Sequence, residues 1–159
     1  MSAPDPDRDA EFEAFVARVE PRLRRALVAS YGPTIGRDAA LDALSWAWEH
    51  WSRVRPMDNP AGYLYRVGQT AAGKHFASPA SAGFPAPPSE GMPDVAPELD
   101  GALRRLSVQQ RAVVVLAHGY ALSQREVAEV LGISVSTVRE HLDRGMGRLR
   151  NELEVRHEH

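Results

Sequence analysis

Cysteine is absent from the 159 residues, so the chain forms neither disulfides nor thiolate centres. That absence suits a reducing compartment. No apolar run approaches the ~20 residues that a membrane-spanning helix needs. The N-terminal stretch MSAPDPDRDAEFEAF is acidic and polar, and it lacks the basic and then apolar segments of a signal peptide. We therefore expect a cytoplasmic protein without a membrane span.

Positive charge is not in excess. The chain has 19 Lys and Arg against 21 Asp and Glu, a formal net charge of -2, so no overall positive field indicates nucleic-acid binding. Lysine is nearly missing, because Lys74 is the only one and the other 18 basic residues are arginine. A GC-rich genome explains this bias more simply than selection of arginine for phosphate contacts.

The patterns that bind metals or catalyse reactions are also missing. The sequence contains no nucleophile–base constellation, no glycine-rich phosphate loop and no carboxylate pair in a plausible cleft. His50, His75 and His118 are scattered, without the spacing of a zinc site. We predict a protein that is not an enzyme and that uses no metal or cofactor.

Runs of alternating β-branched residues are absent, and helical periodicity is what remains. Residues 11–19 place four apolar side chains at i, i+3, i+4 and i+7, namely Phe12, Phe15, Val16 and Val19. Pro21 is expected to kink this helix or to start a new segment. Asn59 and Pro60 predict a helix start, because Asn caps the first turn and Pro fits within it.

A further helix is predicted over residues 38–51. Its apolar face would consist of Leu41, Leu44, Trp48 and Trp51. Trp48 and Trp51 are therefore expected to pack in the core. Trp46 lies off that face, which makes it the better candidate for a surface contact.

Prolines gather in residues 77–97, which hold six of the twelve in the chain together with Ala, Ser and Gly. Proline removes backbone donors and fixes φ, and Ser and Gly add little to a core. We predict an extended, mobile linker here. The expected fold is all-α: two small helical bundles, 1–76 and 98–159, joined by this Pro/Ala/Ser-rich linker.

Two capping boxes predict helix starts in the second half. Ser107 is followed by Gln110 and Ser123 by Glu126, at the spacing in which each side chain accepts a hydrogen bond from the other residue's backbone N–H. Gly119 is expected to end the first of these helices.

The stretch VAEVLGISVSTVREHL ends one helix and begins another within a few residues. Gly132 can take the positive φ of a sharp turn, and Ser134 can cap the next helix. The apolar face of that helix is formed by Val138, Leu142, Gly145 and Leu149. Its exposed polar face is formed by Ser136, Thr137, Arg139 and Glu140. This arrangement predicts a helix-turn-helix that enters a major groove.

The charge around this motif is small. Residues 123–150 contain five arginines against four acids. Phosphate contacts supply most of the affinity for DNA. We therefore expect this half to bind DNA weakly by itself and to need a partner that holds it there.

The stretch LSQREVAEVLGISVSTVREHLDRGMGRLR resembles the C-terminal helix-turn-helix, region 4, of extracytoplasmic-function (ECF) sigma factors of the sigma-70 family, and LRRLSVQQRAVVVLAHGYALS fits the helices before it. In the first half, DAALDALSWAWEHWSRVR is similar to the polymerase-binding helix of region 2. NPAGYLYRVGQTAAGKHF is similar to the helix that meets the −10 element. The resemblance follows the family's order, with a linker in the family's place.

This resemblance implies a protein that joins core RNA polymerase, recognises −35 and −10 promoter elements and helps to melt DNA. The residues that would contact the −35 element are Ser134, Val135, Ser136, Thr137, Arg139, His141 and Arg144, the last by reaching phosphate. Those that would lie near the −10 element are Asn59, Arg66 and Lys74. The polymerase-binding helix would use Asp38, Asp42 and Trp48.

Region 2 of this chain departs from the family's pattern. Leu41 and Ala43 stand where the family usually shows a Gln and a bulkier apolar residue. Gly68 and Gly73 lie in a helix that normally carries several arginines. In region 4, His141 replaces a frequent arginine and Glu140 replaces a small residue; these two departures lie on the recognition helix. The resemblance is thus to an ECF sigma factor with a divergent region 2.

Two alternative functions stay open on the sequence alone. One is a stand-alone helix-turn-helix transcriptional regulator, because response-regulator output domains also favour a TVREHL-like recognition helix. The other is a sigma-like protein that titrates an anti-sigma factor. The candidate partners are therefore promoter DNA, core RNA polymerase and an anti-sigma factor.

Overall fold

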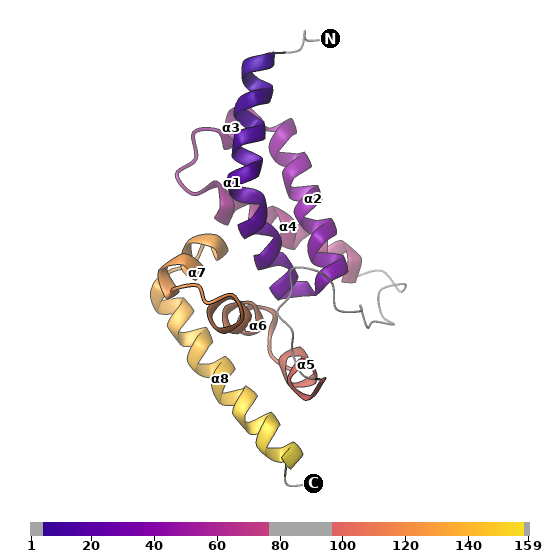
Figure 1. Ribbon diagram of the computed structural model, residues 1–159, viewed down its shortest axis with the longest axis vertical. Coiled ribbons are helices and arrows are strands. Elements are labelled where there is room, and N and C mark those ends of the chain that lie inside the picture. Colours follow the sequence, from indigo (N-terminus) through magenta and orange to yellow (C-terminus); the bar gives the residue numbers. More distant parts are fainter. Residues whose placement is uncertain (1–4, 77–96, 158–159) are drawn as a thin grey trace.

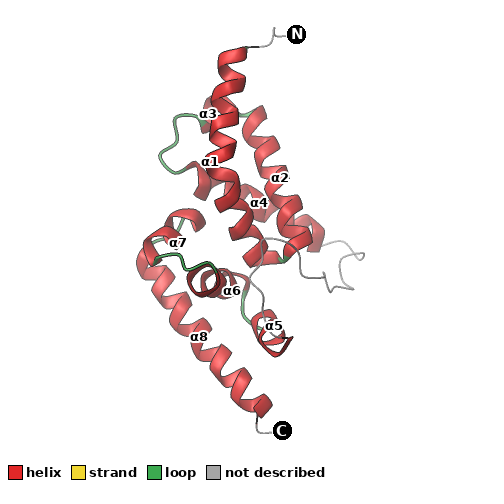
Figure 2. Cartoon of the chain, in the orientation of Figure 1, coloured by secondary structure: helices red, strands yellow, loops and turns green. Residues whose placement is uncertain are grey.

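The computed structural model describes residues 5–76 and 97–157. Within these ranges the backbone consists of helices, turns and bends and contains no strand, which confirms the all-α prediction (Figure 2). The predicted linker lies outside the described residues, apart from Pro97 at its end. None of the helices described combines the length and the apolarity needed to cross a membrane.

The first half contains α1 (Pro6–Tyr31), α2 (Pro33–Glu49), the short α3 (Trp51–Val54) and α4 (Pro60–Phe76). Figure 1 shows α1 and α2 side by side along the upper part of the molecule, with α4 crossing behind them. Helix α4 packs against both α1 and α2. The three long helices therefore enclose one apolar interior.

Helix α1 begins where the sequence places a cap and a proline. The carboxylate of Asp5 accepts hydrogen bonds from the backbone N–H groups of Asp7 (3.1 Å) and Arg8 (3.3 Å), and Pro6 occupies the first turn. Pro21 does not start a new segment, because α1 continues through it to Tyr31. The helix buries apolar residues on both sides of Pro21, and their packing offsets the ~3 kcal/mol that an internal proline costs.

Helix α2 buries a different face from the one that the large side chains predict. Its buried residues include a stripe of small side chains, Ala39, Ala40, Ala43 and Ala47, together with Leu44. Leu41 is 64% exposed and Trp48 is 38% exposed, so the prediction that they pack in the core is wrong. Trp51 is buried, but it belongs to α3. Alanines let neighbouring backbones approach closely, and that approach decides which face turns inward.

The second half contains α5 (Pro97–Arg104), α6 (Val108–Val114), a π-helical turn η2 (Val115–Gly119), α7 (Gln124–Leu131) and α8 (Val135–His157). Both predicted capping boxes are present, at the starts of α6 and α7. Helix α6 passes directly into η2, which ends at Gly119 as expected. In Figure 1, α8 runs from the corner with α7 down to the lower end of the molecule.

Candidate nucleic-acid interface

The corner between α7 and α8 is built by Gly132. Its φ of 68° and ψ of 36° are left-handed, a conformation that glycine adopts without steric cost. The N–H of Ile133 donates to the carbonyl of Ala128 at 3.0 Å, which closes the end of α7. Ser134 then caps α8 by accepting from the N–H of Thr137 at 3.1 Å. The predicted turn and cap are confirmed.

The first turns of α8 hold their inner side against the preceding helices. Val138 is fully buried and Leu149 nearly so. Val135 and Leu142 are partly buried and pack against the same core. The predicted apolar face is therefore the face that docks, and the opposite face is directed away from the protein.

That opposite face contains most of the residues predicted to contact the −35 element. Ser134, Ser136 and Arg139 are exposed, as is Arg144 one to two turns later. Thr137, Val135 and His141 are intermediate in exposure. The hydroxyl of Ser134 is engaged at the helix cap, where it also lies 2.7 Å from the Thr137 hydroxyl. The Ser136 hydroxyl lies 3.1 Å from that of Ser134, so the exposed Arg139 guanidinium offers the most donors on this face.

Two side-chain pairs organise the charges on this face. The Arg139 Nε donates to Oε1 of Gln124 at 3.1 Å, which links the recognition helix to the start of α7. Arg144 Nη2 lies 3.0 Å from Glu140 Oε1, one turn apart. The acid that would repel phosphate is thus paired with a neighbouring cation. The sequence analysis did not predict this contact of Gln124, because only the corner brings Gln124 near Arg139.

Helix α7 is fixed at its start by the second capping box. The backbone and hydroxyl of Ser123 both hydrogen-bond with Glu126, and they lower the pKa of the Glu126 carboxyl. The carboxylate that completes the cap is therefore ionised over a wide pH range, and an anion at a helix N-terminus is favourable.

The three residues predicted to lie near the −10 element share α4 and the turn before it, but their surroundings differ. Asn59 caps α4 by accepting from Gly62 N–H at 3.2 Å, and its Nδ2 donates to the carbonyl of Glu129 at 2.8 Å. Arg66 donates to the carbonyl of Gly132 at 3.2 Å. Lys74 is exposed near the end of the helix. Two of the three therefore bind the helix-turn-helix corner.

The three residues predicted to bind polymerase lie on the outward face of α2. Asp38 and Asp42 are exposed, one turn apart, and Leu41 lies between them. Trp48 continues this face two turns later. We call the stripe formed by Asp38, Leu41, Asp42 and Trp48 the acidic–apolar stripe. It offers apolar contact area flanked by negative charge.

Trp48 is held in place from one side only. The Phe12 ring centroid lies 4.9 Å from that of Trp48, and the Arg8 guanidinium lies 4.5 Å above the Trp48 ring. Arg8 also donates to the backbone carbonyl of Trp48 at 3.0 Å. The indole is therefore oriented by α1 while part of it stays open to solvent.

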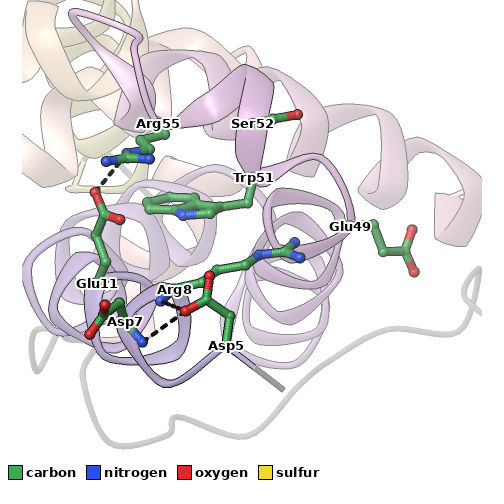
Figure 3. A pocket seen from close by; sticks show the side chains of 8 residues that line it. All are labelled: Asp5, Asp7, Arg8, Glu11, Glu49, Trp51, Ser52 and Arg55. Atoms are coloured by element: carbon green, nitrogen blue, oxygen red, sulfur yellow. Dashed lines mark hydrogen bonds and ion pairs between the residues drawn. The ribbon is translucent and has the colours of Figure 1, made fainter. Parts of the chain in front are cut away.

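A polar pocket lies at the far end of the first half, away from the corner (Figure 3). Trp51 lines it, and the ion pair between Arg55 Nε and Glu11 Oε1 closes one side at 2.7 Å. Asp5 on the other side is engaged in capping α1. Across residues 5–76 and 97–157, no group of three or more His, Asp or Glu side chains could hold a metal ion.

Comparison with known proteins adds three findings. The family described as Sigma-70, region 4, matches residues 97–149, which span α5 to most of α8. The fold is similar to that of the sigma factor RpoE in complex with the anti-sigma factor NepR from Bartonella quintana. That likeness has a TM-score of 0.59 at 20% identity and covers 91% of this chain and 98% of the other. CnrH, in complex with the cytosolic domain of CnrY, gives 0.58 at 24% identity, covering 92% and 90%.

Full-length relatives extend the likeness to both halves. The RNA polymerase sigma-E factor of Streptomyces avermitilis is 30% identical over 158 residues, covering 92% of this chain and 87% of the relative. Those of Streptomyces antibioticus and Streptomyces coelicolor are also 30% identical, with 92% of this chain covered in each and 86% and 88% of the relatives. With region 4 matched and the relatives aligned along nearly the whole chain, the protein belongs to the sigma-70 family, as an RNA polymerase sigma factor of the extracytoplasmic-function, sigma-E type.

Proposed function

We propose that the two halves of this sigma factor divide promoter recognition between them. A sigma factor directs core RNA polymerase to promoters and is not itself an enzyme. In our proposal, residues 98–159 read the −35 element, residues 1–76 bind core polymerase and the −10 element, and residues 77–97 connect them. The sigma assignment replaces the stand-alone regulator, which does not account for a likeness that runs through the first half.

The observation that carries the proposal is the exposed start of α8. Ser136 and Arg139 are solvent-exposed on a helix whose opposite face is buried through Val138. A major groove admits one α-helix, and Arg can donate two hydrogen bonds to the edge of a guanine. Arg139 is the side chain that we assign to base reading, with Ser134, Val135, Ser136, Thr137 and His141 around it. Arg144 is assigned to phosphate.

The first half is proposed to contact the −10 element and core polymerase. We assign Asn59, Arg66 and Lys74 to the −10 element, because all carry hydrogen-bond donors on or beside α4. We assign the acidic–apolar stripe to polymerase, because the centre of a protein interface favours exposed aromatic and apolar side chains. The other partners of this chain are promoter DNA and, by analogy with the two complexes whose folds it shares, an anti-sigma factor. The proposed compartment is the cytoplasm, where RNA polymerase acts.

Binding to core polymerase followed by run-off transcription tests this proposal. The purified chain should co-purify with core enzyme, and the complex should initiate from defined sites on genomic DNA. A known ECF sigma factor serves as the positive control for both steps. If the chain does not bind core enzyme that the control sigma does bind, the proposal is wrong. Tight binding to an anti-sigma factor without transcription would favour the titrating protein instead.

A further inference from the structure

A side-chain hydrogen bond joins the two helices of the helix-turn-helix at the residue to which we assign base reading. The Nε–H of Arg139, on the second turn of α8, donates to Oε1 of Gln124 at 3.1 Å. Gln124 is the first residue of α7 and lies 15 positions before Arg139. Arg139 is exposed, so its guanidinium stays accessible to DNA while it is held from one side.

The backbone that carries Gln124 is firmly anchored. Gln124 directly follows Ser123, whose hydroxyl accepts from the Glu126 N–H at 3.1 Å, while Oε1 of Glu126 accepts from the Ser123 N–H at 3.1 Å. Val127 of α7 and Val138 of α8 are fully buried in the same core cluster. The capping box and this packing fix the backbones of both helices, so the bond can hold the arginine side chain in one orientation.

The bond determines which edge of the guanidinium can meet DNA. Arginine carries five N–H donors in a rigid planar fork, one on Nε and two on each of Nη1 and Nη2. Because Gln124 occupies the Nε donor of Arg139, the edge formed by Nη1 and Nη2 is the one that can meet DNA. Guanine presents O6 and N7 side by side in the major groove, and two donors of one arginine can bind both acceptors at once. The bond to Gln124 and a bidentate bond to guanine can therefore exist together.

The chemical type of the group that holds Arg139 matters as well as its position. An amide oxygen accepts the hydrogen bond without bringing a negative charge, so the guanidinium keeps its attraction for DNA. The neighbouring carboxylate of Glu140 is engaged elsewhere, because its Oε1 lies 3.0 Å from Arg144 Nη2. The bond to Gln124 thus orients Arg139 without neutralising it.

We propose that Gln124 is a positioning residue that sets the preference of Arg139 for guanine in the −35 element. This inference rests on the proposed function, in which Arg139 reads a base edge. An arginine side chain without support is flexible and can turn to donate to a phosphate, a contact that carries no sequence information. Gln124 holds the guanidinium in the orientation that reads a base, so it contributes to specificity more than to affinity.

The test compares the affinities of holoenzymes for a promoter mapped by run-off transcription and for its single-base variants in the −35 element. Gln124→Ala removes the acceptor, and Gln124→Met removes it while keeping a long side chain. Both should lower the preference for guanine at one base pair about three- to tenfold, the range expected for one hydrogen bond, and leave the preferences at other base pairs unchanged. Gln109→Ala, at a half-buried position in the first turn of α6, is the matched control and should behave as the wild type.

Gln124→Glu provides the conservative rescue. A carboxylate keeps the bond to Arg139 and strengthens it, but it also neutralises part of the charge that attracts DNA. The variant should therefore retain the base preference, while its affinity falls about equally for every promoter variant and depends less on salt. A loss of base preference in Gln124→Glu as large as that in Gln124→Ala would contradict the positioning role.

A double-mutant cycle separates positioning from a direct contact between Gln124 and DNA. In a chain that already carries Arg139→Ala, Gln124→Ala should have no further effect, because the side chain that it positions is gone. An equal loss with and without Arg139 would overturn the inference, since Gln124 would then act on DNA or on folding by itself.

Failure of the proposed function looks different from failure of this inference. If Arg139→Ala weakens binding to every promoter variant uniformly, Arg139 does not read a base, and both ideas are wrong. If Arg139→Ala abolishes the base preference while Gln124→Ala leaves it intact, base reading by Arg139 stands and only the role of Gln124 is refuted.

Discussion

The two halves of this sigma factor employ similar side chains in opposite ways. On α8, Arg139 and Ser136 are exposed, and their hydrogen bonds, to Gln124 and Ser134, stay within the second half. Asn59, directly before α4, and Arg66 on α4 carry comparable donors, but both are bonded to the other half. The comparison shows that an exposed position on a helix does not by itself make a side chain available. Whether the side chain is available to a ligand depends on which groups of the protein already bind it.

The halves also differ in how they build their interiors. The first half combines an alanine stripe on α2 with an aromatic cluster, in which the Phe15 and Trp51 ring centroids lie 5.0 Å apart. The second half relies on Val and Leu side chains such as Val113, Leu116 and Val138, all fully buried. The only tryptophans of the chain lie in the first half, which gives that half its own spectroscopic reporter.

The largest expected effect is a loss of stability from a core substitution in each half. Leu27→Ala and Leu116→Ala each remove a fully buried side chain, one in each half, and each should lower the stability of its half by about 2–5 kcal/mol. If the two halves unfold separately, tryptophan fluorescence should report Leu27→Ala strongly and Leu116→Ala weakly during urea unfolding, because all three tryptophans lie in the first half. Val155→Ala, at an exposed position, is the control. Equal shifts for both core variants would mean that the halves unfold as one unit.

The next largest effect concerns promoter binding by the exposed face of α8. Arg139→Ala should cost about 1–3 kcal/mol of binding at one base pair of the −35 element if Arg139 reads a base edge. Arg150→Ala removes the same charge from an exposed position farther along α8 and should leave that base preference intact. Affinities of the holoenzyme for a set of single-base promoter variants provide the measurement. A uniform loss across all variants, with a smaller salt dependence, would assign Arg139 to phosphate.

A smaller effect is expected at the acidic–apolar stripe. Leu41→Ala removes a side chain that is 64% exposed, so folding should be nearly unaffected. Affinity for core polymerase should fall by about tenfold, or 1.4 kcal/mol, if Leu41 lies at the centre of that interface. Val155→Ala, at the other strongly exposed apolar position, should not change it. Unchanged affinity for Leu41→Ala would remove this stripe from the proposed interface.

The smallest effect belongs to a buried hydroxyl pair beneath the junction of the halves. Tyr65 OH and Ser30 Oγ are 2.7 Å apart, and burial raises the pKa of Tyr65 to about 12. The unfolded chain ionises its tyrosine near pH 10, so this stabilisation is complete below pH 10 and is lost as the pH rises towards 12. Tyr65→Phe should cost about 0.5–1.5 kcal/mol at pH 7. It should also flatten the decline in stability between pH 10 and 12, measured by urea unfolding. An unchanged alkaline slope would contradict this account.

What could be predicted from the sequence was the local structure. The capping boxes at Ser107 and Ser123 and the left-handed turn at Gly132 follow from residues within a few positions of one another, and all three are present. The exposure of the α8 start also follows, because the spacing of apolar residues in that helix predicts which face is buried. The structure of region 4 could therefore be predicted from short stretches of sequence.

What could not be predicted depended on distant partners. The inward face of α2 was misassigned because its stripe of alanines carries less weight in a hydrophobic pattern than Leu41 and Trp48. The unbroken α1 depends on packing on both sides of Pro21. The bond from Asn59 to Glu129 joins residues 70 positions apart, and no local signal specifies it. The same holds for Arg139 and Gln124, which only the corner brings together.

The backbones of α4 and α7 approach each other closely at Gly62, and the sequences of related proteins can be searched for this glycine. The turn after α7 requires Gly132, so a glycine at this position in relatives would not indicate whether their two halves pack together. Gly62 has no such local reason, since a glycine inside a helix is less favourable than almost any other residue except proline. A Cβ atom at this position would lie 3.0 Å from the Gly132 Cα and 3.1 Å from the Glu129 carbonyl oxygen, so in a relative that carries a side chain here these neighbours must shift by a few tenths of an ångström. The residue at this one position in α4 thus indicates which family members can bring α4 and α7 this close without such a shift.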